Sequence, residues 1–279
     1  MKHCPHCQSV MDDDEKICPQ CPYREPEVEP ASAADFLHRG IARHKKGKGA
    51  EAIADLEKAL ALDPELANAR VHLAMVFGDN AGIWLGLKYW DRAMELFERS
   101  ISLHPLATVL NQRAMAYLSC NQWAKAIADA SHAHEMDTAY FPALITRAVA
   151  YHQQGKIDLA LADHSLVLQL RPDYAPAWRN RARDHLARHD YPAAIADLSR
   201  ALELEPNHPA AYCDRANAHA QLKQYDCALA DCNEAIRLDP AFVLAYEHRA
   251  KLYRLTGDLG RASEDERFIH PKKWWQFWR

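Results

Sequence analysis

The chain has 279 residues, of which 49% are hydrophobic and 26% charged, and its formal net charge is −4 at pH 7. No apolar run approaches the ~20 residues that a membrane-spanning helix needs, and the acidic balance does not favour bulk binding to nucleic acid. The first ten residues are polar and contain two cysteines, unlike a signal peptide. We therefore expect a cytoplasmic protein whose eight cysteines serve as metal ligands and core residues rather than as disulfides.

Two Cys-x-x-Cys pairs open the chain, formed by Cys4, Cys7, Cys18 and Cys21. Each pair can turn tightly enough to aim two thiolates at one ion, and four thiolates complete a closed tetrahedral zinc shell. The segment resembles the short zinc ribbons at the front of many bacterial proteins. It departs from them at Gln8 and Pro22, where such ribbons usually have glycines that favour the turn.

We predict a zinc ribbon over residues 1–22, in which zinc is structural because four protein ligands leave no open position for a reactive water. His3 and His6 are alternative ligands. The ribbon would either dock a partner or cap the chain that follows. Residues 23–32, rich in glutamate and proline, read as an extended acidic linker.

A repeat of 34 residues dominates the rest of the chain. The dipeptide Arg-Ala recurs with its arginines at Arg113, Arg147, Arg181, Arg215 and Arg249. Alanine and aspartate follow in the same rhythm, at Ala126, Ala160, Ala194, Ala228 and Ala262, and at Asp129, Asp163, Asp197, Asp231 and Asp265. Apolar residues between these markers run at helical period, so each unit reads as two helices. Small residues lie where the helix axes approach most closely, and we expect Arg147 to pair with Asp163 across the hairpin.

This pattern resembles the tetratricopeptide repeat family. Seven units fit it over residues 33–270, at about 33–66, 67–106, 107–140, 141–174, 175–208, 209–242 and 243–270. The resemblance implies an all-α solenoid of helical hairpins, wound as a right-handed superhelix behind the small ribbon. It also implies a concave groove, lined by the first helix of each unit, that binds peptides or other proteins. The family is a scaffold rather than an enzyme, and no convergent acid, base and nucleophile stands out in this chain.

The second unit, 67–106, is longer than its neighbours. Apolar residues keep helical spacing from Ile83 to Ile101. We therefore predict that the insertion extends the start of the unit's second helix by two turns. Trp84 and Leu85 lie off this stripe, and they either pack against the adjacent unit or offer a docking spot.

The resemblance also places the groove positions of the first helices. The candidate partner-binding residues are Asn111, Gln112, Thr146, Arg179, Asn180, Arg183, Asp214, Asn217, His248, Lys251 and Arg254. Arg179 and Arg183 are four residues apart on one helix face and suit a carboxylate. With Asn217 they resemble the carboxylate clamp of chaperone-binding relatives, although Glu247 stands where a base would help. The alternatives are a partner with anionic side chains or a terminal carboxylate, and an ordinary solvated groove.

Other residues of reactive types have plainer interpretations. Cys213, Cys227 and Cys232 occupy interior-type positions of one unit, so we expect small buried side chains. His185 and His189 have the spacing that places two side chains on one helix face, but a third metal ligand is lacking.

The last nine residues, 271–279, form a basic aromatic tail that contains Lys272, Lys273, Trp274, Trp275, Phe277 and Trp278. Three roles compete. The tail folds back over the open end of the solenoid, lies at a membrane–water interface where tryptophan and lysine are favoured, or serves as a short motif for another protein.

The sequence as a whole predicts a non-enzymatic adaptor with structural zinc, which binds partner proteins or peptides in a solenoid groove. The alternative is an assembly factor tethered at a membrane surface by the tail. Neither the partner nor the oligomeric state follows from the sequence.

Overall fold

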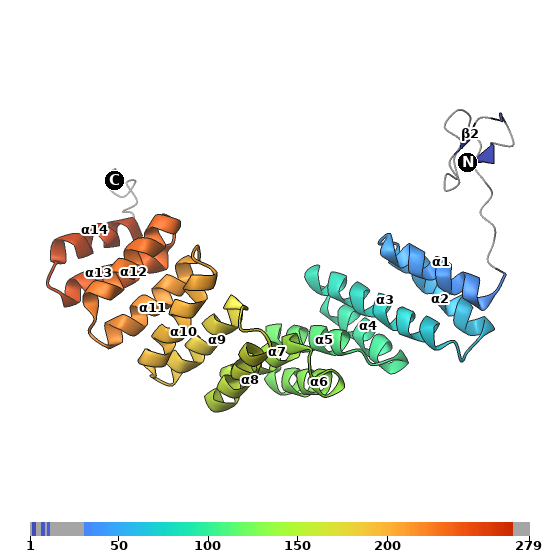
Figure 1. The fold of residues 1–279 in the computed structure, drawn as a ribbon, viewed down its shortest axis with the longest axis horizontal. Helices are drawn as coiled ribbons and strands as arrows, with labels where there is room; N and C mark the ends of the chain where they lie inside the picture. The colour runs from blue at the N-terminus through green and yellow to red at the C-terminus, as the bar shows by residue number, and fades with distance from the viewer. Residues whose placement is uncertain (1, 4–6, 9, 12–30, 270–279) are drawn as a thin grey trace, which may run out of the picture. The chain divides into compact units, whose positions relative to one another are not determined.

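The computed structural model describes residues 2–3, 7–8, 10–11 and 31–269. Three of the predicted zinc ligands (Cys4, Cys18 and Cys21), most of the linker and the whole aromatic tail lie outside these residues, as does His6. Within them the chain forms fourteen helices and one pair of two-residue antiparallel strands, β1 (Lys2–His3) and β2 (Val10–Met11) (Figure 1). The prediction of a helical solenoid is confirmed, and none of the described helices is long and apolar enough to span a membrane.

The helices follow one another as hairpins. Their bounds are α1 Ala33–Lys45, α2 Gly49–Leu62, α3 Ala67–Gly86, α4 Trp90–Leu103, α5 Ala107–Ser119, α6 Trp123–Met136, α7 Phe141–Gln153, α8 Ile157–Leu170, α9 Ala175–Ala187, α10 Tyr191–Leu204, α11 Pro209–Gln221, α12 Tyr225–Leu238, α13 Val243–Leu255 and α14 Leu259–Ile269.

The chain divides into two compact units, residues 1–77 and 78–279. In the first, Ser32 and Asp35 form a capping box that starts α1. Gly40 then faces α2 so closely that an added Cβ would lie 2.9 Å from Leu56 Cγ. Glycine at this position is what lets α1 and α2 approach, as the small-residue pattern predicts.

In the second unit each helix packs on the next, and alternate helices such as α5 and α7, or α11 and α13, also touch. The alanines of the recurring Arg-Ala dipeptide and those that begin the second helices are almost fully shielded from solvent: Ala114, Ala148, Ala182, Ala216, Ala250, Ala126, Ala160, Ala194, Ala228 and Ala262. The interior is therefore continuous from hairpin to hairpin and consists largely of small side chains.

One backbone device recurs inside every hairpin. The turn between the two helices contains a residue with positive φ: Gly47, Lys88, Asn121, Gly155, His189, Lys223 and Gly257. Four of the seven are not glycine, so the hairpins accept the strain of the left-handed region there. The turn then delivers the chain, two residues later, to the start of the second helix.

The predicted place of the insertion is wrong. The extra residues lengthen the first helix of the second unit, because α3 has 20 residues where the corresponding helices have 13, whereas α4 keeps the usual 14. Lys88 has φ +65° and reverses the chain between Leu87 and Trp90. Trp84 and Leu85 pack against the core cluster that includes Phe97, so the packing alternative holds for them.

Arginine and aspartate join the two helices of every hairpin except that of α3 and α4. Nε and Nη2 of the arginine donate to the two carboxylate oxygens at 2.7–2.9 Å, and the partners are always 16 residues apart. The pairs are Arg39–Asp55, Arg113–Asp129, Arg147–Asp163, Arg181–Asp197, Arg215–Asp231 and Arg249–Asp265. This confirms the predicted Arg147–Asp163 pair and the structural role of the series.

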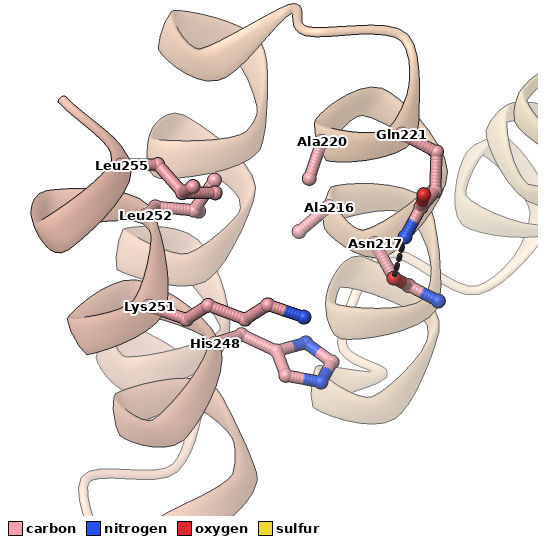
Figure 2. A pocket seen from close by; sticks show the side chains of 8 residues that line it. All are labelled: Ala216, Asn217, Ala220, Gln221, His248, Lys251, Leu252 and Leu255. Carbon is pink, nitrogen blue, oxygen red and sulfur yellow. Dashed lines mark hydrogen bonds between the residues drawn. The ribbon is translucent and has the colours of Figure 1, made fainter.

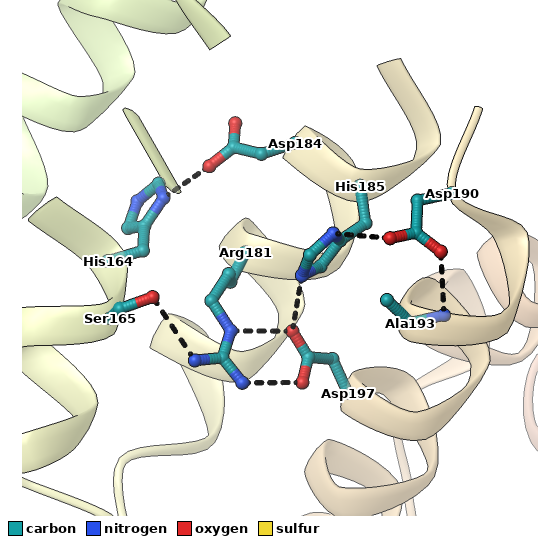
Figure 3. A network of polar contacts seen from close by, with 8 residues as sticks. All are labelled: His164, Ser165, Arg181, Asp184, His185, Asp190, Ala193 and Asp197. Carbon is teal, nitrogen blue, oxygen red and sulfur yellow. Dashed lines mark hydrogen bonds and ion pairs between the residues drawn. The ribbon is translucent and has the colours of Figure 1, made fainter. Parts of the chain in front are cut away.

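The same arginines also reach back to the preceding hairpin. In Figure 3, Arg181 Nη1 donates to Ser165 Oγ on α8 at 3.3 Å while its other nitrogens hold Asp197 on α10. Equivalent bonds run from Arg147 to Ser131, Arg215 to Ser199 and Arg249 to Asn233. Each of these guanidinium groups therefore connects three helices of two successive repeats.

One hairpin folds without this arginine–aspartate pair. In the hairpin of α3 and α4, Leu96 is at the aspartate position, and Asn80, the residue 16 before it, is at the arginine position. We predict that Asp163→Leu lowers the free energy of unfolding by about 3 kcal/mol, because it leaves Arg147 buried without its carboxylate. The double variant Arg147→Leu/Asp163→Leu should recover most of that loss. Urea unfolding followed by circular dichroism measures both, and a double variant as unstable as the sum of the single ones would contradict the expectation.

Candidate functional site

One groove site lies between two first helices, α11 and α13. This α11–α13 pocket has a volume of about 190 Å³ and is lined by Ala216, Asn217, Ala220, Gln221, His248, Lys251, Leu252 and Leu255 (Figure 2). Every lining residue belongs to a first helix. The pocket is therefore on the surface that the family resemblance assigns to partner binding.

The α11–α13 pocket has an apolar side and a polar side. Alanines of α11 and the leucines of α13 face one another across it, whereas Lys251 and His248 extend from α13 toward α11. On α11, Gln221 Nε2 donates to Asn217 Oδ1 at 3.5 Å. Such a pocket suits an apolar side chain, and its amide, imidazole and ammonium groups can bind the polar atoms beside that side chain.

Burial shifts the acid–base behaviour of this region. Burial lowers the pKa of His248, and so does the charge of Lys251, while Asp214 acts in the opposite direction. Burial also raises the pKa of Asp214, which the Arg183 guanidinium opposes at 3.6 Å. His248 is therefore favoured in its neutral form, in which one ring nitrogen accepts a hydrogen bond.

A smaller pocket of about 100 Å³ lies where α7, α8 and α9 meet. This α7–α9 pocket is lined by Val149, His152, Gln153, His164, Asn180, Arg183 and Asp184. Its floor is a buried polar cluster: Asp184 accepts from His152 Nδ1 at 2.7 Å and from His164 Nδ1 at 2.6 Å. His164 and Asp184 are each only 1% exposed. Figure 3 shows the bond between them.

A third, more open hollow of about 530 Å³ lies between α13 and α14. It is lined by Glu247, Ala250, Lys251, Arg254, Glu266 and Ile269. Arg254 forms an ion pair with Glu266 across it. Lys251 thus belongs to both this hollow and the α11–α13 pocket.

The structure groups some predicted groove residues and separates others. Asn217, His248 and Lys251 share the α11–α13 pocket, while Asn180 and Arg183 share the α7–α9 pocket. The three residues of the clamp-like set do not share a pocket, because Arg179 pairs with Glu205, and Arg183 and Asn217 line different pockets.

Two predicted groove residues are interior instead. Asn111 and Thr146 are 4% and 5% exposed, and Thr146 Oγ1 donates to the Pro142 carbonyl. Gln112 is only partly buried, but its Oε1 atom is shielded and has no hydrogen-bond partner among the described residues.

The structure corrects part of the predictions for the three cysteines of one unit and for the His185–His189 pair. Cys213 and Cys232 are buried, which raises the pKa of each thiol to about 12, but Cys227 is exposed. Ala228 takes the interior position of α12, and its neighbour therefore turns outward. His189 does not share a helix face with His185, because α9 ends at Ala187 and His189 occupies the left-handed turn.

Little of the predicted zinc site is within the described residues. Cys7 is exposed in the turn that joins β1 to β2, and Gln8 beside it has φ +59°. Glutamine therefore adopts the left-handed conformation for which zinc ribbons usually use glycine. No cluster of three or more metal-binding side chains occurs among the residues that the structure describes.

Comparison with known proteins identifies the repeats. Residues 36–66 and 179–241 match tetratricopeptide repeat families. The chain therefore carries tetratricopeptide repeats, and the sequence-based resemblance is confirmed for them. No protein with a curated description matches the sequence.

Solved structures show the same fold at low identity. The C-terminal part of a TPR repeat-containing protein from Cytophaga hutchinsonii is 18% identical, with a TM-score of 0.63 over 85% of this chain and 96% of that one. A tetratricopeptide repeat protein from Parabacteroides merdae is 17% identical, with a TM-score of 0.57 over 87% and 93%. YrrB, described as a TPR protein with an unusual peptide-binding site, is 19% identical, with a TM-score of 0.51 over 64% and 90%.

The lowered pKa of His248 predicts a pH dependence. A folded-state pKa below the unfolded one contributes stability that is present above about pH 6.5 and is lost as pH falls through the folded value. We expect the wild type to lose more free energy of unfolding than His248→Gln between pH 7 and about pH 5. Urea unfolding at a series of pH values measures this, and parallel curves for the two proteins would contradict it.

Proposed function

We propose that this chain of tetratricopeptide repeats is a non-enzymatic scaffold that binds an extended segment of a partner protein along its first helices. The α11–α13 pocket supports the proposal most directly, because only first-helix residues line it and it combines an apolar side with polar groups. The right-handed superhelix that the resemblance implies stays a prediction.

The pocket's chemistry favours a segment with an apolar side chain next to an acceptor. Leu252 and Leu255 offer the apolar contact, and Asn217 and Lys251 offer donors beside it. A carboxylate near Lys251 would gain a charge-assisted bond, in keeping with the anionic partner proposed from the sequence. Glu247 in the adjoining hollow limits how far an anion can extend toward α14.

Substitutions in the pocket should weaken partner binding. A peptide selected from a random displayed library on the full-length protein serves as the probe, and fluorescence anisotropy measures its affinity. Leu255→Asp and Lys251→Glu should each lower the affinity at least about tenfold, or 1.4 kcal/mol, since one adds a charge to the apolar side and the other repels a carboxylate.

Arg237→Ala is the matched control. This residue lies on α12, a second helix, where it forms an exposed ion pair with its helix neighbour Glu234. The variant should bind the peptide like the wild type. Selected peptides that bind both pocket variants as tightly as the wild type would place the binding surface elsewhere and overturn the proposal.

A structural zinc in the amino-terminal ribbon belongs to the proposal as well. The short β1–β2 pair and the left-handed Gln8 fit a tight turn that carries the first Cys-x-x-Cys pair. Cys4, Cys7, Cys18 and Cys21 would hold the ion, which would stabilise a segment too small for a core of its own. Tethering at a membrane by the aromatic tail concerns residues outside those described and stays a prediction.

The zinc content of purified protein tests the ribbon. We expect about one zinc per chain by elemental analysis, because four thiolates suit a single ion. Cys7→Ser should lower the zinc content, whereas Cys120→Ser, which removes another exposed thiol, should not. Zinc-free protein from zinc-supplied cells would refute the ribbon.

A further inference from the structure

The hollow between α13 and α14 corresponds to a surface that the preceding repeat keeps covered. A step of one repeat, 34 residues, relates the lining of the hollow to residues of α11 and α12. Glu247, Ala250, Glu266 and Ile269 correspond in this way to Cys213, Ala216, Cys232 and Ala235. The last four side chains are at most 1% exposed. The hollow is therefore the face of the α13–α14 hairpin that, in the preceding repeat, packs against the next hairpin.

In the preceding repeat, the helix that follows in the sequence covers this face. Two core clusters join α13 to it: Ala245 with Cys213 and Ala235, and Leu252 with Ala216 and Cys232. Ala211 of α11 joins the α9–α10 hairpin in the same manner. No described helix covers the equivalent face of α13 and α14, where the next residues of the chain are 270–279. Because the array covers each such face with the segment that follows, these residues are the first candidate for the hollow.

The hollow differs from its covered counterpart by charge. It has Glu247 and Glu266 where α11 and α12 have cysteines, and Arg254 where α11 has Ala220. Glu247 is exposed, and the side chains of Glu266 and Arg254 are 34% and 61% exposed. A further repeat of small apolar residues would remove these charges from water, which is unfavourable. The hollow therefore fits a segment that brings both apolar rings and charges.

Residues 270–279 have this mixed chemistry. The segment contains, in order, Lys272, Lys273, Trp274, Trp275, Phe277, Trp278 and Arg279. Aromatic rings suit the apolar part of the lining, Ala250 and Ile269. Rings also stack on cations, which Lys251 and Arg254 supply. The two lysines of the segment complement the carboxylates of the lining.

Reach and size agree with this occupant. The segment begins directly after Ile269, which lines the hollow, and an extended chain advances about 3.3 Å per residue. Residues 272–275 therefore need no long loop to enter the hollow, and a short connection costs little loop-closure entropy. The hollow, at about 530 Å³, has more than twice the volume of the α11–α13 pocket, which is about 190 Å³. It therefore accommodates more than one side chain.

We propose that residues 270–279 fold back into the α13–α14 hollow. Their tryptophan rings pack against Ala250 and Ile269, and Lys272 or Lys273 pairs with Glu247. The segment then covers α13 and α14 as α13 covers α11 and α12. Among the three roles that the sequence leaves open for the basic aromatic tail, this is the one in which it covers the solenoid. The contact lies within the chain and is independent of partner binding.

Fluorine NMR of the full-length protein, with 5-fluorotryptophan at its seven tryptophans, tests the contact. Trp274→Phe, Trp275→Phe and Trp278→Phe each remove one signal and so assign the tail. A synthetic peptide of residues 270–279 gives the signals of fully exposed rings. In the full chain at least one tail signal should differ in chemical shift from that of the peptide, and a soluble paramagnetic agent should broaden it less.

Charge reversal locates the contact in the hollow. Glu247→Lys should return the tail signals toward those of the peptide, because it repels the tail lysines. Adding Lys272→Glu and Lys273→Glu to this variant should restore the protected signals. Glu264→Lys is the matched control: it reverses an exposed charge on α14 outside the lining of the hollow, and its tail signals should match those of the wild type. Unchanged signals of the tryptophans in the helices would show that each variant is folded.

Three results would overturn the proposal. Tail signals identical to those of the peptide would show exposed rings, and an equal response to Glu247→Lys and Glu264→Lys would place the contact elsewhere. Tail-dependent binding to vesicles of phosphatidylglycerol and phosphatidylcholine would assign the tail to a membrane surface. Co-sedimentation measures this binding, with Trp274→Ala/Trp275→Ala as the comparison. We expect the wild type and this variant to bind such vesicles equally weakly.

Discussion

The array depends on one polar contact, the arginine that binds an aspartate of its own hairpin and a serine or asparagine of the hairpin before it. Small alanines let the helices approach, but close approach alone does not select which helix meets which. A guanidinium has a fixed fork of donors, so it bonds both carboxylate oxygens and a third group only when three helices stand in register. Because this contact lies between helices, it leaves the exposed faces of the first helices free to differ from repeat to repeat.

Much of the fold could be predicted from the sequence. The period of 34 residues gave the hairpins, and the spacing of 16 residues between arginine and aspartate gave their pairing. Ser131, Ser165 and Ser199 recur at the same period and could have been recognised as the third partners. The insertion was misplaced because a tight turn at Lys88 preserves the phase of the apolar stripe, so periodicity alone does not reveal the break. Alignment of Trp90 with Trp123, which begins α6, would have shown where α4 starts.

The candidate sites were harder to predict, for a physical reason. Groove positions taken from a resemblance place a side chain on a helix face, but they do not say whether a neighbour already binds it, as Glu205 binds Arg179. His164 and Asp184 were not predicted from the sequence, because they occupy interior positions that are not among the groove positions of the family. The signal was present as a departure from the repeat: a polar residue at a position where most of the other repeats have a buried apolar residue. In a repeat array, a residue type that recurs at one position in every unit serves the stacking of the units. A residue type found there in one unit alone marks chemistry that this hairpin does not share with its neighbours.

Hydrogen–deuterium exchange of Arg215→Ala tests the central interaction most directly. Arg215 binds Asp231 on α12 and Ser199 on α10. If the guanidinium joins successive repeats, amide exchange should accelerate in α10 as well as in α11 and α12, while α5 and α6 keep wild-type protection. Acceleration confined to α11 and α12 would show that the arginine stabilises only its own hairpin, and it would contradict the claim that this contact holds successive repeats together.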